Sequence, residues 1–287
     1  MHFLVIGLLA LASFTYAEPI PSEISPAYGY ITKYGIPQAE KIRKAEEDYL
    51  TSRIIGGVPA GNGQYPFQAG LLGEVVGLEG VTVCGASLIT QDRAITAAHC
   101  WYDGTHQVWR FTVVLGSTFL FSGGTRVQTS AMAVHPNFNV FLARNDVGVL
   151  YIPTVSFSNS IAPIALPTGS ALFENYAGES AIAIGFGLTS QGGSISGELN
   201  HVRLSVVENS VCRLAFPVIL QSSNICTSGL GVNICQGDSG GPLITTRNNQ
   251  YVLIGVSSFV STLGCDSGLP AVYARATAFM DFFNAHL

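Results

Sequence analysis

The chain has 287 residues, of which 48% are hydrophobic and 11% are charged, and its formal net charge is -5. This apolar composition excludes intrinsic disorder, and the length suits one large β domain or two smaller ones. Lysine and arginine together number 13 against 18 acidic residues, so the chain lacks the basic surplus of proteins that bind nucleic acid. Nucleic-acid binding is therefore excluded.

The first 17 residues predict a signal peptide. An apolar run from Phe3 to Phe14 has the length of a hydrophobic signal region, and small residues end the segment at Ala17. A membrane anchor is the alternative, but a membrane-spanning helix needs about 20 apolar residues and this run is shorter. We therefore expect a secreted, extracellular protein without a membrane partner.

Residues 18–53 differ in composition from everything after them. They contain all three lysines of the chain and four prolines, but no cysteine, so no disulfide can hold them to the body of the protein. The run 38–50 predicts a short charged helix with Ile42, Ala45 and Tyr49 on one side. Because this apolar face is thin, we expect a mobile or loosely docked segment.

A single basic residue, Arg53, precedes the run Ile-Ile-Gly-Gly at residues 54–57. This arrangement is an accessible cutting point for a trypsin-like protease. An ordinary linker is the alternative, because arginine is common in linkers. The division that we expect is a signal peptide over 1–17, a propeptide over 18–53 and the main domain over 54–287.

After residue 54, short β-type runs alternate with clusters of Gly, Asn, Ser and Pro, which is typical of a β-barrel or a β-sandwich. One helix is expected near the end, over 276–285, where Phe279, Phe282 and Phe283 recur at helical spacing. The strands that the pattern predicts cover residues 68–72, 86–89, 108–115, 147–152, 181–184 and 252–256.

The six cysteines all lie after residue 83. An even number of cysteines behind a signal peptide indicates an oxidising compartment and three disulfides. Their spacing alone does not decide among the possible pairings.

The stretch CQGDSGGP at residues 235–242 places the hydroxyl of Ser239 between glycines. Glycine allows tight or positive-φ geometry that a Cβ would block, so such a turn can aim the serine outward and leave backbone N–H groups free for a substrate oxygen. A glycine-rich surface turn is the alternative. Because a serine hydroxyl is a poor nucleophile alone, the catalytic interpretation needs a base and a group that orients the base.

Candidates for both groups lie upstream. His99 stands in the run TAAHC, where a disulfide at Cys100 would fix the backbone beside it, and Asp146 stands in NDVGVL at the start of an apolar strand. A structural histidine and an ordinary turn aspartate are the respective alternatives.

Together, these motifs resemble those of the trypsin/chymotrypsin family of serine proteases, in the family's His, Asp, Ser order. The resemblance runs from Ile54 to Leu287 and includes IIGG at 54–57, Gly-Phe-Gly at 185–187 and Ser258 before Cys265. It implies an all-β fold of two antiparallel six-stranded β-barrels, with the site between them and a helix at the C-terminus.

The resemblance also implies catalytic roles. His99 takes the proton of Ser239 as the serine attacks a peptide carbonyl, and Asp146 holds the imidazole in the required tautomer. The backbone N–H groups of Gly237 and Ser239 form the oxyanion hole. No metal or organic cofactor is expected, and residues 116–126 lack the paired acidic residues of the family's calcium loop. The disulfides that the resemblance implies are Cys84–Cys100, Cys212–Cys226 and Cys235–Cys265.

In the family, cleavage of the propeptide has a direct consequence for the site. Cleavage after Arg53 frees the Ile54 ammonium, which the resemblance pairs with Asp238. An unpaired buried charge costs several kcal/mol, so the oxyanion loop is expected to be poorly formed before cleavage. We therefore expect an inactive zymogen that a trypsin-like protease activates.

The pocket residues predict an apolar preference. The position that holds the family's pocket-base aspartate is Asn233 here, so no counter-charge for Lys or Arg is present. Alignment of Ser258 with the family's pocket serine puts Val260 on one wall, where it narrows the slot, and Ala271 on the other.

The sequence therefore predicts a secreted serine endopeptidase that cleaves after apolar residues in a chymotrypsin- or elastase-like manner. It is similar to arthropod digestive chymotrypsins and related collagenolytic enzymes, which implies a digestive role. The expected partners are protein or peptide substrates, the activating protease and protein protease inhibitors, and a monomer is expected. A regulatory protease of body fluid or venom and a non-catalytic binding protein are the alternatives.

Overall fold

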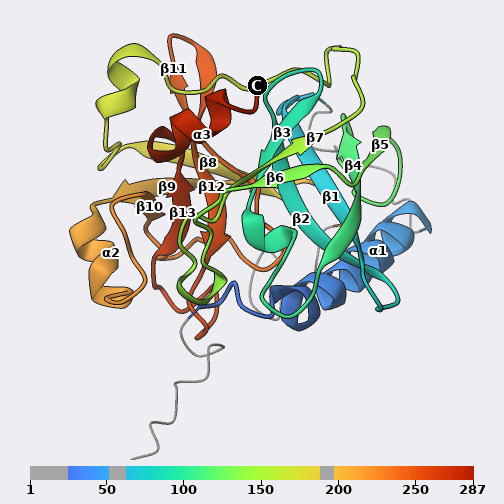
Figure 1. The fold of residues 1–287 in the computed structure, drawn as a ribbon, viewed down its shortest axis with the longest axis horizontal. Helices are drawn as coiled ribbons and strands as arrows, with labels where there is room; N and C mark the ends of the chain where they lie inside the picture. The colour runs from blue at the N-terminus through green and yellow to red at the C-terminus, as the bar shows by residue number, and fades with distance from the viewer. Residues whose placement is uncertain (1–24, 52–62, 188–196) are drawn as a thin grey trace, which may run out of the picture.

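Two antiparallel β units lie side by side in the computed structural model and account for most of the chain that it describes, residues 25–51, 63–187 and 197–287 (Figure 1). The expected all-β class is thereby confirmed. The predicted signal peptide, Arg53 and Ile54 lie outside the described residues.

The N-terminal unit is a seven-stranded sheet in the order β5-β4-β1-β2-β3-β7-β6, one strand more than the resemblance implies. Its two edge strands, β5 and β6, are separated along the chain only by residues 130–131, so one interrupted strand supplies both edges of a curled sheet. The interruption occurs where the Ala131 N–H donates to the Thr129 hydroxyl at 3.0 Å. The strands are β1 Gln68–Val75, β2 Val81–Leu88, β3 Arg93–Thr96, β4 Val108–Leu115, β5 Thr125–Thr129, β6 Met132–Val134 and β7 Gly148–Tyr151.

The C-terminal unit is a closed six-stranded barrel in the order β10-β13-β12-β11-β8-β9, as expected. The β11–β12 hairpin turns at Asn248 and Asn249, which both have positive φ, as a two-residue hairpin turn that matches the twist of its strands requires. The strands are β8 Ser180–Gly185, β9 Asn200–Val207, β10 Asn224–Thr227, β11 Pro242–Arg247, β12 Gln250–Phe259 and β13 Ala271–Arg275.

Two helical pieces, η6 Ala276–Phe279 and α3 Met280–Asn284, cover the predicted C-terminal helix. Phe279 and Phe283 are buried in the core cluster that also contains residues of both β units. The helical spacing of these phenylalanines thus reflects their packing in the core. The helix α2 Asn209–Ala215 was not predicted; short 3-10 turns lie at η3 Ala98–Cys100, η4 Val140–Leu142 and η5 Gly169–Phe173.

The N-terminal segment is folded against the body, which corrects the expectation of a mobile or loosely docked propeptide. After the π-helical turn η2 Ile31–Gly35, helix α1 Ile36–Thr51 lies along the N-terminal sheet and contacts β2 (Figure 1). Its inward face combines apolar Ala39 and Ile42 with polar Gln38 and Glu46, and all four are buried. The spacing of apolar residues predicted too small a buried face, because two of the buried positions are polar. Tyr49, which was expected on the buried side, is exposed.

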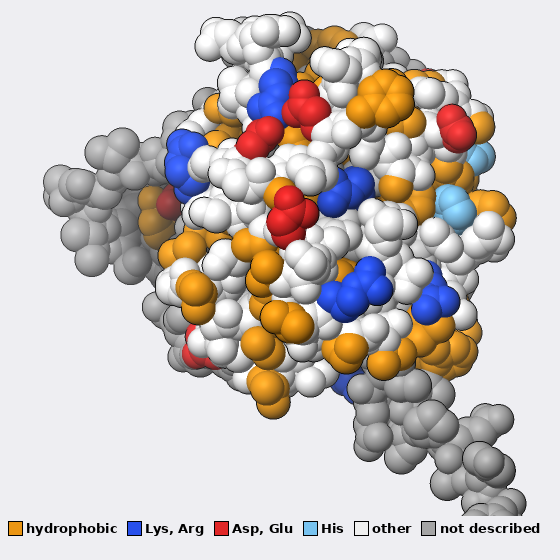
Figure 2. All heavy atoms as spheres, turned by 90° about the vertical axis from the view of Figure 1, so that its left-hand side faces the viewer, with side chains coloured by type: hydrophobic (Ala, Val, Ile, Leu, Met, Phe, Trp, Pro, Cys, Tyr) orange, Lys and Arg blue, Asp and Glu red, His pale blue; other side chains and the backbone are white. Residues whose placement is uncertain are grey.

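The three disulfides join the cysteines that the resemblance pairs: Cys84–Cys100, Cys212–Cys226 and Cys235–Cys265. Within the described ranges, no helix is long and apolar enough to cross a membrane. The face that carries α2 shows acidic and basic side chains next to each other and hydrophobic side chains scattered among polar ones, without a continuous basic area (Figure 2).

Candidate active site

His99 is held at the junction of the two β units. It lies in η3, directly after β3, and the Cys84–Cys100 disulfide fixes the adjacent residue to β2. Its backbone N–H donates to Asp146 Oδ1 at 2.9 Å, and its ring Nδ1 lies 2.7 Å from Asp146 Oδ2. Two contacts to one carboxylate fix both the backbone and the ring of the histidine.

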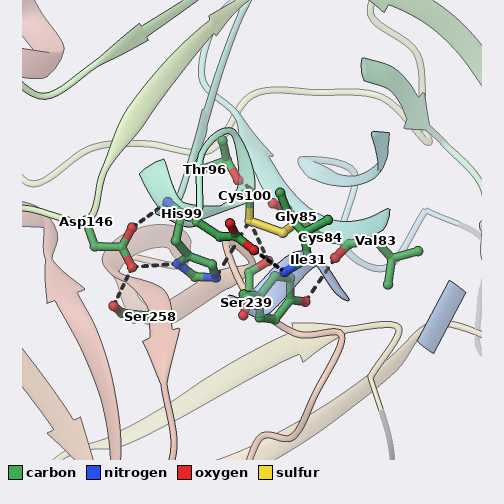
Figure 3. The surroundings of a disulfide bond; sticks show 12 residues. Ile31, Val83, Cys84, Gly85, Thr96, His99, Cys100, Asp146, Ser239 and Ser258 are labelled. Carbon is green, nitrogen blue, oxygen red and sulfur yellow. Dashed lines mark hydrogen bonds and ion pairs between the residues drawn. A yellow bond between two sulfur atoms is a disulfide. The ribbon is translucent and has the colours of Figure 1, made fainter. Parts of the chain in front are cut away.

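Asp146 is aimed by a tight turn immediately before β7. Asn145 adopts positive φ, which asparagine tolerates better than most residues, and its side chain donates to the Asn137 carbonyl at 2.8 Å. The hydroxyl of Ser258, on β12, donates to Asp146 Oδ2 at 2.6 Å. Figure 3 shows the carboxylate between the Ser258 hydroxyl and the His99 ring. The buried carboxylate is therefore stabilised by residues from both β units.

Ser239 lies in the β10–β11 loop, whose glycines have the geometry that the sequence predicted. Gly237 and Gly240 have φ values of +98° and +79°. The Ser239 carbonyl accepts the Gly85 N–H at 2.7 Å, and the Gly240 N–H donates to the Ser257 carbonyl at 2.8 Å. The loop is thereby held to β2 and β12, beside the Cys84–Cys100 disulfide (Figure 3).

Asp238, next to the serine, is a buried carboxylate held by two backbone donors. The Gly187 N–H donates to Oδ1 and the Cys235 N–H donates to Oδ2, both at 2.9 Å. Burial raises the pKa of Asp238 to about 6, against the lowering effect of these two hydrogen bonds. A cavity of about 230 Å³ reaches Asp238 and is also lined by Gly185, Gly187 and Asn233.

The four predicted pocket residues do not share one cavity. Ser258 and Val260 line a pocket beside Ser239, together with Ile234 and Gln236. Asn233 instead lines the cavity at Asp238, and its side-chain amide donates to the Leu269 carbonyl at 3.1 Å. Ala271 is fully buried in β13. The structure therefore brings Ser258 and Val260 to the pocket beside Ser239 and places Asn233 and Ala271 outside it.

The N-terminal segment supplies residues that sequence reasoning missed. Pro26, Tyr30 and Tyr34 line the pocket beside Ser239, and the Tyr30 ring meets the His99 ring edge-on at a centroid distance of 4.8 Å. His99 is completely buried. No local pattern signals these contacts, because the partners are distant in sequence.

Among the described residues, the one group with the spacing of a metal site is Cys84, His99 and Cys100. Both sulfurs of this group belong to a disulfide, and a metal ligand must be a free thiolate. These residues therefore do not fit a metal ion.

The buried His99–Asp146 pair and the nearby Ser239 loop (Figure 3) have the arrangement that is typical of a serine-protease site. Residues 54–283 match the family model described as Trypsin. The chain belongs to the trypsin family and is a serine endopeptidase, which confirms the resemblance.

Known relatives agree with this assignment. A collagenase of Hypoderma lineatum is 37% identical over 81% of this chain and 86% of its own length. Serine protease 1 of Drosophila melanogaster is 32% identical over 82% of this chain and 86% of its own length. A proclotting enzyme of Tachypleus tridentatus is 32% identical over 83% of this chain and 67% of its own length. A solved collagenase structure superposes with a TM-score of 0.73 at 34% identity, covering 81% of this chain and 98% of that one.

Proposed function

We propose that the chain is the zymogen of a secreted serine endopeptidase that cleaves after apolar residues and uses Ser239, His99 and Asp146 as its catalytic triad. The observation that carries this proposal is the contact of Asp146 with both the ring and the backbone N–H of His99. This contact serves a general base, because it sets which ring nitrogen is free to accept a proton.

In the proposed reaction, Ser239 Oγ attacks the substrate carbonyl while His99 Nε2 takes the hydroxyl proton. The tetrahedral intermediate places its oxyanion at the N–H groups of Gly237 and Ser239, a contribution that typically amounts to about 100- to 1000-fold per donor in turnover. The intermediate expels the amine, which takes the proton from His99, and a water then hydrolyses the acyl-enzyme by the same route. Ser258 supports this chemistry as a positioning residue through Asp146.

Activation is proposed to follow from cleavage after Arg53. The Ile54 ammonium would enter the cavity that reaches Asp238 and pair with its carboxylate. The raised pKa of Asp238 supports this step, because burial disfavours the charge while the two backbone donors alone do not compensate. An ammonium there would supply the missing opposite charge.

The apolar preference is supported by Asn233, which carries no charge, and by Val260 on the wall of the pocket beside Ser239. Three disulfides support an extracellular location. The relative named a collagenase supports an extracellular protein as the substrate, and the digestive role stays part of the proposal on the resemblance to digestive enzymes. The second candidate role, limited proteolysis in a body fluid, is favoured by the relative named a proclotting enzyme.

Cleavage of a peptide library by the matured chain tests the proposal. We expect cuts after apolar residues and none after Lys or Arg, and no activity from a Ser239→Ala variant matured in parallel. Preferential cleavage after Arg or Lys would refute the assignment of the pocket base. Cleavage of a few defined sites in plasma-type proteins, with a poor rate on general protein substrates, would favour the regulatory role.

A further inference from the structure

Tyr30 of the N-terminal segment occupies the position where a substrate would meet the catalytic groups. It is 4% exposed, its ring packs edge-on against His99, and its hydroxyl donates to the Val83 carbonyl at 3.0 Å. Burial raises the pKa of Tyr30, while the nearby Ser239 side chain and Gly237 backbone act in the opposite direction. Tyr30 and Ser239 line the same pocket, so the phenol lies beside both His99 and the proposed nucleophile.

The geometry of this contact blocks the site without offering a bond to cut. The backbone at Tyr30 is helical, with φ -53° and ψ -44°, and continues into η2. Peptides that add to a sheet edge bind in an extended form, so a helical turn does not present its carbonyl as a substrate does. The part of Tyr30 that enters the pocket beside Ser239 is its side chain, and a phenol offers no leaving group.

The turn that carries Tyr30 is anchored on both sides to one loop of the catalytic domain. The Ile31 N–H donates to Asp103 Oδ2 at 2.8 Å, and the Gly29 N–H donates to the Asp103 carbonyl at 2.9 Å. Ile31 is completely buried and Tyr28 stacks on Phe141 at 5.2 Å. These contacts hold the turn that carries the phenol directly against the catalytic domain.

Helix α1 adds two further anchors. Gln38 packs against the oxyanion loop so closely that a Cβ on Gly237 would lie 3.0 Å from its Cγ. The Glu46 carboxylate accepts the N–H groups of Leu120 and Phe121 at 2.5 and 3.0 Å. Between these points Ile42 is 1% exposed. The segment thus binds the catalytic domain as a folded ligand through packing contacts at Gln38 and Ile42 and hydrogen bonds at Glu46.

We propose that residues 25–51 are an intramolecular inhibitor that stays bound after cleavage at Arg53 and is removed by a second cleavage at its own lysines. The inference rests on the proposed function of the site. Activation would then need two events: the first frees Ile54, and the second clears Tyr30 from Ser239 and His99.

The distribution of lysine supports the second event. The three lysines of the chain, Lys33, Lys41 and Lys44, all lie in this segment and are all exposed. Cleavage at Arg53 would free the C-terminal end of α1, and a freed helix end frays and becomes a protease substrate. Each cut consumes one water and leaves a carboxylate on the lysine and an ammonium on the next residue. A lysine-directed protease can thus dismantle the inhibitor, while the domain after residue 54 offers it no lysine.

The test uses the full chain with Leu50→Ile, Thr51→Glu and Ser52→Gly, which places a four-residue processing site directly before Ile54. A protease specific for that site makes the first cut, and a lysine-specific protease makes the second. Activity on a short apolar chromogenic peptide is measured after each cut. Size-exclusion chromatography with mass spectrometry reports, independently of activity, whether the segment is still bound.

We expect the intact segment to co-elute after the first cut and the activity at micromolar protein to rise at least about 30-fold after the second cut, since a single buried aromatic anchor at an interface carries that much affinity. With Tyr30→Ala the first cut alone should release most of the activity. Tyr30→Phe, which keeps the ring and the packing, should weaken inhibition about tenfold through loss of the hydroxyl. Arg43→Ala, which removes only exposed ion pairs of α1, should stay within about twofold of the parent.

The same samples separate the two proposals, because all variants yield one identical mature enzyme after both cuts. Full activity after the first cut with the segment intact would overturn the inhibitor, as would departure of the segment at that stage. A correctly cut, segment-free enzyme that is silent would count against the proposed catalytic function, while co-elution would still decide the fate of the segment.

Discussion

The buried carboxylate of Asp238 should make the stability of the proform depend on pH in a direction opposite to that of most acids. Its pKa is raised from 3.8 to about 6, so between these values the folded chain holds a proton that the unfolded chain has lost. The free energy of unfolding therefore falls as pH rises through this range. A difference of about 2 pKa units corresponds to about 3 kcal/mol at about 1.4 kcal/mol per unit.

The variant Asp238→Asn isolates this contribution. The amide does not titrate, although it sets an NH₂ group against one of the two backbone donors, which costs about 1–3 kcal/mol at every pH. Denaturant unfolding of both proforms from about pH 4 to pH 7 gives the difference in unfolding free energy. We expect the parent to lose about 3 kcal/mol relative to the variant over this range.

Two further arms make the experiment decisive. Asp266→Asn, at an exposed aspartate, controls for the introduction of an amide. In the matured chain the Ile54 ammonium should lower the pKa of Asp238. The free energy of unfolding of the parent should therefore increase relative to that of Asp238→Asn as pH rises. If the difference in unfolding free energy between the parent and Asp238→Asn proforms stayed constant from pH 4 to 7, the reasoning would be refuted.

Two substitutions test how Asp146 and Ser258 serve the proposed reaction. Asp146→Asn replaces the acceptor for the His99 ring with a group that favours the wrong tautomer, so kcat should fall about 10⁴-fold with little change in KM. A loss of kcat below about tenfold in steady-state assays would contradict the proposed role of Asp146. Ser258→Ala removes the 2.6 Å hydrogen bond to Asp146, which should lower kcat about tenfold and shift the acid limb of the pH–rate profile; an unchanged limb would leave Ser258 a purely structural residue.

The sequence predicted correctly those features that depend on residues close together along the chain. Strand β4 begins and ends at the predicted residues, 108 and 115, because its apolar residues are flanked by polar and turn-forming ones. Positive φ at Gly237 and Gly240 could likewise be expected from the glycines themselves. The CQGDSGGP, TAAHC and NDVGVL motifs led to residues that the fold brings to one junction.

The N-terminal segment shows where that reasoning ends. Glu46 is buried because it meets the Leu120 and Phe121 amides, which lie 74 and 75 residues further along the chain. Nothing near Glu46 distinguishes it from the exposed Glu40 and Glu47 of the same helix. Tyr30 likewise looks like one of several tyrosines before residue 50 until the fold places it against His99. Long-range polar partners carry no periodic signal, so only the structure shows them.

Covalent labelling of Ser239 tests the central claim most directly. The matured enzyme would be treated with a reactive phosphonofluoridate, and the adduct would be located by peptide mass spectrometry. We expect one phosphonyl group per chain, on Ser239, at a rate that falls as His99 becomes protonated, and no adduct with Ser239→Ala. A correctly matured, folded enzyme that takes up no label, or that takes it up at another residue, would contradict the account.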